Sequence, residues 1–263
     1  MDVRAQPLEA LVLRNIAYGD ADSVVHLLVR GRGRVSAFAR GARSSQRRFG
    51  GALEPFGRIE AMLAEKEGQE LWMLREAHVL SGHGKLRDDL HRIAHAGYAA
   101  ELIHDLTRAG EPADVLFALL EEFLCRLEQA AATSARLRAL ELHALEASGL
   151  APELSACARC GGAVPPGRAG FDPGAGGLVC GNCAHSSLVL ASGPRAALTQ
   201  LRWGGLASAD SPVSADGSGR PADAKAFEDA CAQAAKPMHA FLVHHLGRGM
   251  RSAEFMQQVG APP

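Results

Sequence analysis

Two pairs of cysteines constrain this chain more than any other feature. They are Cys157, Cys160, Cys180 and Cys183. Each pair has the spacing CxxC, and nineteen residues separate the pairs. A CxxC turn directs two thiolates at one ion, and two such turns complete a tetrahedron with Zn–S distances of about 2.3 Å. Because four thiolates leave no position for water or substrate, we predict one structural Zn²⁺ per chain and no catalytic metal.

Other interpretations of the cysteines fit less well. Disulfides belong to oxidising compartments, which nothing in the sequence indicates. A thioredoxin-like redox pair needs a surrounding βαβ unit, and none is apparent here. His185, two residues after Cys183, is an alternative ligand, although a solvated loop histidine fits its context better. Cys125 and Cys231 lie in helical runs and are predicted to be small core residues.

The first eighty residues alternate short apolar runs with turn signals, which is typical of β-structure. Strands are predicted over residues 9–18, 22–30, 33–41, 56–65 and 70–80. Five short strands in this length fit a small closed barrel, which leaves no exposed sheet edge. A fragment of a β-sandwich is the alternative.

After Leu86 the apolar spacing becomes helical. Helices are predicted over residues 88–110, 112–127, 134–148, 194–203 and 224–246. We expect the first three to pack as a bundle and the last to return to it, since each must bury its apolar stripe. The cysteine-containing segment has no helical period, and residues 204–224 are predicted to form a loop rich in Gly, Ser, Pro, Ala and Asp.

Positive charge gathers near the N-terminus. Residues 1–48 hold nine Arg and four acidic residues, a formal charge of +5, whereas the remaining residues carry −6. Seven of the arginines fall within nineteen residues that contain no acid: Arg30, Arg32, Arg34, Arg40, Arg43, Arg47 and Arg48. Arginine binds phosphates through bidentate hydrogen bonds, so the run predicts a polyanion-binding surface.

The charge alone leaves DNA, RNA and an acidic protein open as ligands, and an ordinary solvated face is the alternative to all three. A basic groove on a small barrel suits single-stranded nucleic acid, in which aromatic side chains stack on bases. Phe38 is predicted to belong to the core. For Phe49, core packing and base stacking both stay open.

No catalytic centre is apparent, so we expect a protein that is not an enzyme. Gly31 and Gly33 lack the third glycine and the helix of a dinucleotide loop, and the sequence contains neither a Walker A nor a GxSxG motif. His91 and His95 have the spacing of an HExxH metal site, but Arg92 stands where the general base is needed. Both histidines are predicted to lie on a helix surface.

The sequence also predicts a cytoplasmic location. No apolar run approaches the ~18 residues of a membrane span, and the N-terminus lacks the basic start and long apolar run of a signal peptide.

Several segments, in the same order, resemble the RecO family of bacterial recombination mediators. They are YGDADS (18–23), GRGRVSAFARGAR (31–43), FGGALEPF (49–56), LELHALEASGLAPELSACARCGG (140–162), GGLVCGNC (176–183) and FLVHHLGRGMRSAEFM (241–256). Each segment is moderately specific. Their order, together with the cysteine pairs, is highly specific and spans nearly the whole chain.

The resemblance implies an α+β multidomain fold: an N-terminal five-stranded OB-fold β-barrel, then a helical bundle with an inserted four-cysteine zinc module. On this basis we expect the barrel over residues 1–80, a discontinuous helical domain over 81–152 and 188–263, and the zinc module over 153–187. The 204–224 loop matches no segment of the family.

The resemblance also implies a function. RecO proteins bind single- and double-stranded DNA, anneal complementary strands and, with RecR, help load RecA onto DNA coated by single-strand-binding protein, whose acidic C-terminal tail many of them bind. The seven arginines thereby become candidate DNA contacts, and a nucleoid-associated monomer is expected. A zinc-braced interaction adaptor with little direct DNA binding is the alternative. A zinc hydrolase or nuclease is a third reading, against which the saturated four-thiolate site counts.

Overall fold

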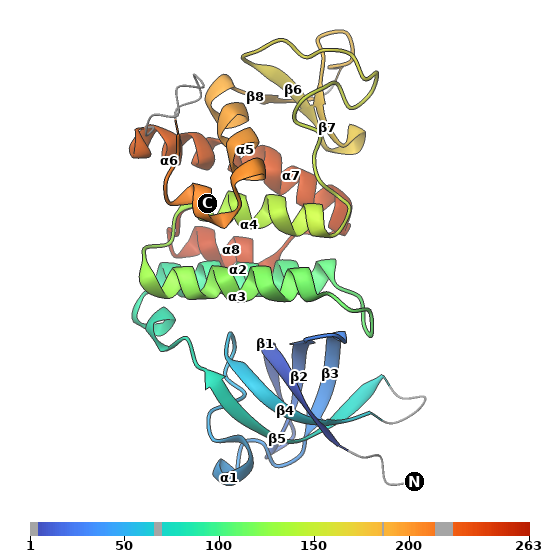
Figure 1. Cartoon of the computed structure of the whole chain (residues 1–263), viewed down its shortest axis with the longest axis vertical. Coiled ribbons are helices and arrows are strands. Elements are labelled where there is room, and N and C mark those ends of the chain that lie inside the picture. The colour runs from blue at the N-terminus through green and yellow to red at the C-terminus, as the bar shows by residue number, and fades with distance from the viewer. Residues whose placement is uncertain (1–4, 66–69, 186, 214–222) are drawn as a thin grey trace. The chain divides into compact units, whose positions relative to one another are not determined.

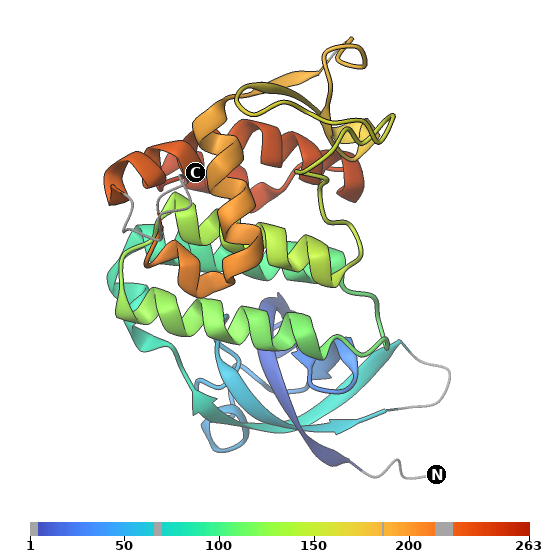
Figure 2. The ribbon, with the colours of Figure 1, turned by 45° about the horizontal axis from the view of Figure 1, so that its top comes forward.

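The computed structural model describes residues 5–65, 70–185, 187–213 and 223–263. The chain forms two compact units, one up to Ala130 and one from Ala131 onward (Figures 1 and 2). This division by compactness places the first two long helices with the barrel. The predicted domain boundaries divide the chain by type of structure and stay a prediction. Among the described helices, none combines the length and apolar character that crossing a bilayer requires.

The first unit begins with a closed five-stranded barrel, as predicted. Its strands are β1 (Gln6–Tyr18), β2 (Asp22–Val29), β3 (Gly33–Ala39), β4 (Arg58–Ala64) and β5 (Leu71–Ser81). They follow the order β1-β2-β3-β5-β4, and β4 pairs again with β1. All pairings are antiparallel except β3 with β5. This closed mixed topology is that of an OB-like barrel, so the alternative of a sandwich fragment is wrong.

Strand alternation determines which side chains fill the barrel. In β3 the small and branched residues Val35, Ala37 and Ala39 point inward and are buried. Phe38 therefore lies on the outer face, half-buried, and its predicted place in the core is wrong. Phe49, at the end of the short helix α1 (Gln46–Phe49), is only 2% exposed and belongs to the barrel core.

Two helices complete the first unit: α2 (Leu90–Leu106) and α3 (Asp114–Gln129). A short 3-10 turn, η1 (Gly84–Asp88), precedes them. The Asp89 carboxylate caps α2 by accepting hydrogen bonds from the first backbone amides of the helix. Of the two α2 histidines predicted to lie on the helix surface, His91 is exposed but His95 is fully buried, so that prediction is wrong for His95.

A network of ion pairs connects α3 to the barrel. Arg30 pairs with Glu9 at 2.9 Å and with Glu121 of α3 at 3.5 Å. Arg58 of β4 pairs with the same two carboxylates, and the Arg30 guanidinium lies 4.3 Å from the ring centre of buried Phe117. These half-buried pairs fix α3 against β1, β4 and the β2–β3 turn.

The second unit holds five helices within its described residues. They are α4 (Ser134–Ala147), α5 (Ser192–Gly204), α6 (Ala224–Gln233), α7 (Ala235–Leu246) and α8 (Arg251–Gln258). Helix α4 contacts α5, α6 and α7, so segments on both sides of the cysteine region pack together. The Glu228 carboxylate of α6 accepts hydrogen bonds from the first amides of α4, those of Ser134 and Ala135.

The structure modifies two predictions in this unit. The helix predicted over 224–246 is interrupted at Ala234, because Pro237 has no amide to donate and its ring would clash with the Gln233 carbonyl. The predicted 204–224 loop starts with a 3-10 turn, η3 (Leu206–Ala209), and its residues 214–222 lie outside the described part. Helix α8 was not predicted.

Candidate metal centre and nucleic-acid interface

The four cysteines converge on one point. Their Sγ atoms all lie within 4.8 Å of one another, and those of Cys160 and Cys180 are 3.8 Å apart. A tetrahedron with metal–sulfur bonds of about 2.3 Å has edges of about 3.8 Å. The site therefore has the dimensions of a four-thiolate metal centre.

Two tight turns build this site. In the first, the Gly161 amide donates to the Cys157 carbonyl at 2.8 Å, and Gly161 adopts a φ of +69°, which favours glycine. In the second, between β7 (Gly177–Val179) and β8 (Leu188–Leu190), the Cys183 amide donates to the Cys180 carbonyl at 2.9 Å. Each turn presents two sulfurs on one side of the backbone.

Contacts within the cluster shift the pKa values of two of the thiols in opposite directions. The Cys180 amide donates to Cys157 Sγ at 3.3 Å and lowers the pKa of Cys157 to about 6. The neighbouring Cys180 thiol and burial raise the pKa of Cys183 to about 12. Four thiolates this close repel one another unless a cation compensates them, and a soft four-sulfur set suits Zn²⁺.

The other metal-ligand candidates lie elsewhere. His185 is exposed and is not a member of the four-residue cluster. Cys231 is fully buried, and burial raises the pKa of its thiol to about 12, as expected of an inert core residue. Cys125 is half-buried on α3.

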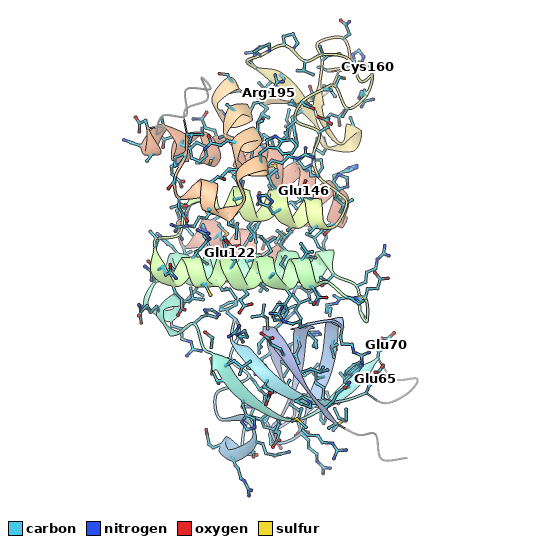
Figure 3. The ribbon with its side chains drawn as sticks, viewed as in Figure 1. Glu65, Glu70, Glu122, Glu146, Cys160 and Arg195 are labelled. Carbon is cyan, nitrogen blue, oxygen red and sulfur yellow. The ribbon has the colours of Figure 1, made fainter. Side chains whose placement is uncertain are left out.

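Contacts around the cysteines tie them to a small sheet of order β7-β6-β8, with β6 spanning Ala169–Asp172. Arg159, inside the first CxxC, pairs with Asp172 at 2.6 Å. Buried Phe171 packs against Phe241 of α7, with ring centres 5.8 Å apart. Figure 3 marks Cys160 on this module and Arg195 on α5, whose guanidinium donates to the carbonyls of Val164 and Pro165. The cysteine module is thus packed onto α5 and α7.

The seven predicted DNA-contact arginines fall into two groups at opposite ends of β3. The proximal group lies at the end where α2 and α3 meet the barrel, and the distal arginine cluster lies beside α1 (Figure 1). The proximal group is Arg30, Arg32 and Arg34. The distal arginine cluster is Arg40, Arg43, Arg47 and Arg48.

The proximal arginines mostly have partners within the protein. Arg30 is held by Glu9 and Glu121, as described above. Arg34 donates through Nη1 to the His104 ring and to the His104 carbonyl at 3.3 Å. Arg32 is exposed in the β2–β3 turn and, within the described residues, pairs with no carboxylate.

The distal cluster carries charge that no described carboxylate neutralises. Arg40, Arg43 and Arg47 are exposed. Two hydrogen bonds hold their loop: the Arg43 amide donates to the Ala21 carbonyl at 2.9 Å, and the side chain of half-buried Arg48 donates through Nη2 to the Arg40 carbonyl at 2.7 Å. The Arg43 guanidinium also donates to the Gly19 carbonyl at 3.3 Å, so the loop is anchored while Arg40, Arg43 and Arg47 stay exposed.

An aromatic pair lies at the same end of the barrel. Tyr18, 61% exposed, packs edge-on against Phe38 with ring centres 5.8 Å apart. The strand register continues this surface as one cross-strand row of Ile16, Val24, Phe38 and Met73. Sequence reasoning missed this pair, although the alternation of Val35, Ala37 and Ala39 around Phe38 signals that Phe38 faces outward.

Comparison with known proteins places this architecture in one family. Residues 4–83 match the family model described as Recombination protein O N terminal, and residues 87–207 match that described as Recombination protein O C terminal. The DNA repair protein RecO of Anaeromyxobacter dehalogenans is 48% identical over 256 residues, covering 96% of both chains.

More distant relatives extend the match. The DNA repair protein RecO of Myxococcus xanthus is 40% identical over 252 residues, covering 96% of this chain and 97% of the relative. That of Pelobacter propionicus is 36% identical over 255 residues, covering 97% of both. With both family models matched in order and relatives aligned along almost the whole length, this chain belongs to the RecO family of DNA repair proteins.

Proposed function

We propose that this RecO-family chain is a DNA-binding recombination mediator that anneals complementary strands and, with RecR, helps load RecA onto single-stranded DNA coated by single-strand-binding protein. It acts without a catalytic centre. Arginines neutralise the phosphates of two strands, which lets the strands approach and pair.

The observation that carries this proposal is the distal arginine cluster beside the Tyr18–Phe38 pair. Exposed guanidinium groups bind phosphates, and exposed aromatic rings stack on bases of any sequence. Both kinds of group lie at one end of an OB-like barrel. The nearby acids are Asp20 in the β1–β2 turn and Asp22 at the start of β2, and Asp22 accepts a hydrogen bond from the Gly41 amide at 2.7 Å. This combination supports single-stranded nucleic acid as the ligand.

The four-cysteine site enters this function as a brace. We propose that Cys157, Cys160, Cys180 and Cys183 hold one Zn²⁺ that stabilises the second unit. A bound Zn²⁺ would fold the two turns onto one centre and, with four sulfur ligands, would offer no position to a substrate. Loss of the metal is then expected to lower stability first, and DNA binding only as a consequence.

Strand annealing measured with and without single-strand-binding protein tests the proposal. The full-length protein is expected to accelerate pairing of complementary oligonucleotides in both conditions without ATP. Replacing Arg40, Arg43 and Arg47 by Gln should remove most of the acceleration. Glu60→Gln, on the exposed face of β4, is the control for a surface substitution. Annealing that the triple variant leaves unchanged would contradict the proposed surface.

One observation favours a second candidate, a zinc-braced protein-interaction adaptor. Trp203 of α5 is 78% exposed, with the Arg202 guanidinium 5.5 Å from its ring centre. An exposed tryptophan beside an arginine is typical of an interaction anchor. Binding of RecR or of the single-strand-binding protein tail that survives the arginine substitutions but is lost in Trp203→Ala, with annealing absent in the wild type, would favour the adaptor.

A further inference from the structure

A pocket opens on the outer face of the barrel, within the first unit. It lies where β2 and β3 meet the end of α2 and the segment before α3, and its volume is about 620 Å³. Pockets of roughly 300–1,000 Å³ are the usual size for small ligands. The residues that matter here are His26, Arg34, Ser36, Glu70, His104 and Gly110.

Arg34 brings a guanidinium that is only partly used. Its Nη1 lies 3.0 Å from His104 Nε2 and 3.2 Å from His104 Nδ1, and it donates to the His104 carbonyl at 3.3 Å. The His104 ring also contacts its neighbour Asp105, with Nδ1 3.1 Å from Oδ1. Within the described residues, no hydrogen bond occupies Nη2 or Nε of Arg34. Two guanidinium nitrogens of Arg34 thereby keep their donors for a ligand.

His26 and Ser36 supply a further donor. His26 Nδ1 and Ser36 Oγ are 3.0 Å apart on neighbouring strands. If the hydroxyl donates to Nδ1, the neutral ring keeps a free Nε2–H. If Nδ1–H donates to the hydroxyl oxygen, the hydroxyl proton stays free. In both tautomers the pair retains one proton that can be donated into the pocket.

The charges around the pocket are mixed, with the cations nearer to His26. Burial, and then the charges of His104, Arg14 and Arg34, lower the pKa of His26, which shows a positive surrounding at that ring. The carboxylates are Asp105, bound to the far side of His104, and Glu70, exposed at the start of β5 (Figure 3). The pocket therefore favours an anion near His26 and Arg34, and Glu70 opposes it from the rim.

The pocket directly continues the aromatic surface. Arg14, His26 and Ser36 are paired across β1, β2 and β3, as are Ile16, Val24 and Phe38. On each strand the two sets are two residues apart, so they lie on the same face of the sheet. Two residues of a strand span about 6.7 Å, roughly one nucleotide of an extended single strand. A base on the Tyr18–Phe38 pair would thus place a neighbouring phosphate at the pocket.

On the side of Gly110, the segment before α3 packs against β3. The Gly110 amide donates to the Arg34 carbonyl at 3.2 Å. The segment there packs so closely that a Cβ on Gly33 would lie 1.7 Å from the Glu111 carbonyl oxygen. An extended strand that follows the sheet in this direction must turn away or end there.

We propose that this pocket binds one phosphate group of a single strand whose neighbouring base stacks on the Tyr18–Phe38 pair. Arg34 and the His26–Ser36 pair donate to the phosphate oxygens. The inference rests on the proposed function for the source of the phosphate, which is either a strand terminus or an internal phosphodiester. The chemistry of the pocket is the same for both.

Inorganic phosphate tests the pocket without DNA. In the full-length protein, phosphate is expected to shift the imidazole NMR signals of His26 and His104 saturably and to raise the pKa of His26, whereas chloride at equal ionic strength should not. Arg34→Gln is expected to weaken phosphate binding about tenfold or more, because it removes a charge-assisted donor. Arg32→Gln, an equal charge change outside the pocket, is the matched control.

If Arg34→Gln does not fold, two variants that keep Arg34 still test the pocket. Ser36→Ala should weaken phosphate binding several-fold, and Glu70→Gln should strengthen it. Unmoved His26 and His104 signals in the wild type, or equal losses in Arg34→Gln and Arg32→Gln, would overturn the pocket.

Oligonucleotides with a 5′-phosphate, a 3′-phosphate or neither then identify the source. Tighter binding of one phosphorylated form that Arg34→Gln abolishes assigns a strand terminus, and equal binding of all three that Arg34→Gln weakens assigns an internal phosphodiester. Equal binding that Arg34→Gln leaves unchanged overturns the inference. A wild type that binds no oligonucleotide contradicts the proposed function, whereas the phosphate titration still reports on the pocket alone.

Discussion

The four-cysteine site and the distal arginine cluster differ in how their chemistry is satisfied. The four cysteine sulfurs lie within 4.8 Å of one another, and together they would fill the coordination sphere of one ion. Of the distal arginines, Arg40, Arg43 and Arg47 are exposed, and no described carboxylate forms an ion pair with any of the four. A site whose ligands all come from the protein stabilises the fold, whereas charged groups without a partner in the protein can bind an external ligand. The most conspicuous motif of the sequence is therefore not where we place the function.

The largest expected effect comes from removing one ligand of the four-cysteine site. Cys160→Ser removes one of four ligands, and the second unit should lose its zinc and several kcal/mol of stability, since structural zinc contributes on the order of 10 kcal/mol in small zinc domains. Metal analysis and thermal unfolding measure both effects. Cys125→Ser, outside the site, should keep one zinc per chain. Full zinc content in Cys160→Ser would refute the assignment.

Removing the charges of the distal arginine cluster should have the next largest effect, on the affinity for single-stranded DNA. Replacing Arg40, Arg43, Arg47 and Arg48 by Gln should weaken binding of a single-stranded oligonucleotide about a hundredfold or more at low salt, because each contact to a phosphate is electrostatic. Fluorescence anisotropy measures this. Arg30→Gln changes an arginine that already pairs with Glu9 and Glu121, so it should lower stability and leave affinity nearly unchanged. If the distal variant and Arg30→Gln lost equal affinity for the oligonucleotide per arginine replaced, the proposed difference between the distal and proximal arginines would be contradicted.

The aromatic pair should contribute less than the charges. Replacing Tyr18 or Phe38 by Ala should lower the affinity for single strands by about 1–3 kcal/mol for each base that loses its stacking partner, with little change in salt dependence. Trp203→Ala, an exposed aromatic of the second unit, is the matched control. Affinity unchanged in both single variants would exclude stacking at this pair.

The smallest expected effect concerns pH. Burial, with the charges of His104, Arg14 and Arg34, lowers the pKa of His26 below its ordinary 6.5. The unfolded chain then binds a proton at a higher pH than the folded chain, so stability falls as pH drops below about 6.5 towards the lowered pKa. Urea unfolding in a Trp203→Phe background, followed by the fluorescence of buried Trp72, should show this fall, and His26→Gln should reduce it. An equal fall in both proteins would assign the pH dependence to other groups.

Local patterns predicted much of the fold. The five strands and the cysteine pairs are visible in the sequence because period-2 alternation and ligand spacing are local properties. Pro237 also indicates the break at Ala234, which lies three residues before it. Proline has no amide hydrogen, so it cannot make the helical hydrogen bond to the Gln233 carbonyl. The apolar character of Phe38 predicts a place in the core, but the alternation of β3 turns its side chain outward.

The division of the arginines was not accessible from sequence. Arg30 and Arg40 look equivalent in a run without acids, yet only Arg30 meets Glu121, which lies 91 positions later in the chain. In the same way, the pocket needs His104 of α2 beside Arg34 of β3. Contacts between distant segments decide which charges are neutralised, and a single sequence shows no sign of them.

The salt dependence of single-strand binding tests the central claim most directly. For single strands, the slope of log affinity against log salt changes by about 0.7 for each phosphate contact. Replacing all four distal arginines by Gln should flatten the slope by up to roughly 2.8, while Arg30→Gln should leave it unchanged. A slope that stays the same in the distal variant would show that DNA is held elsewhere and would contradict the account.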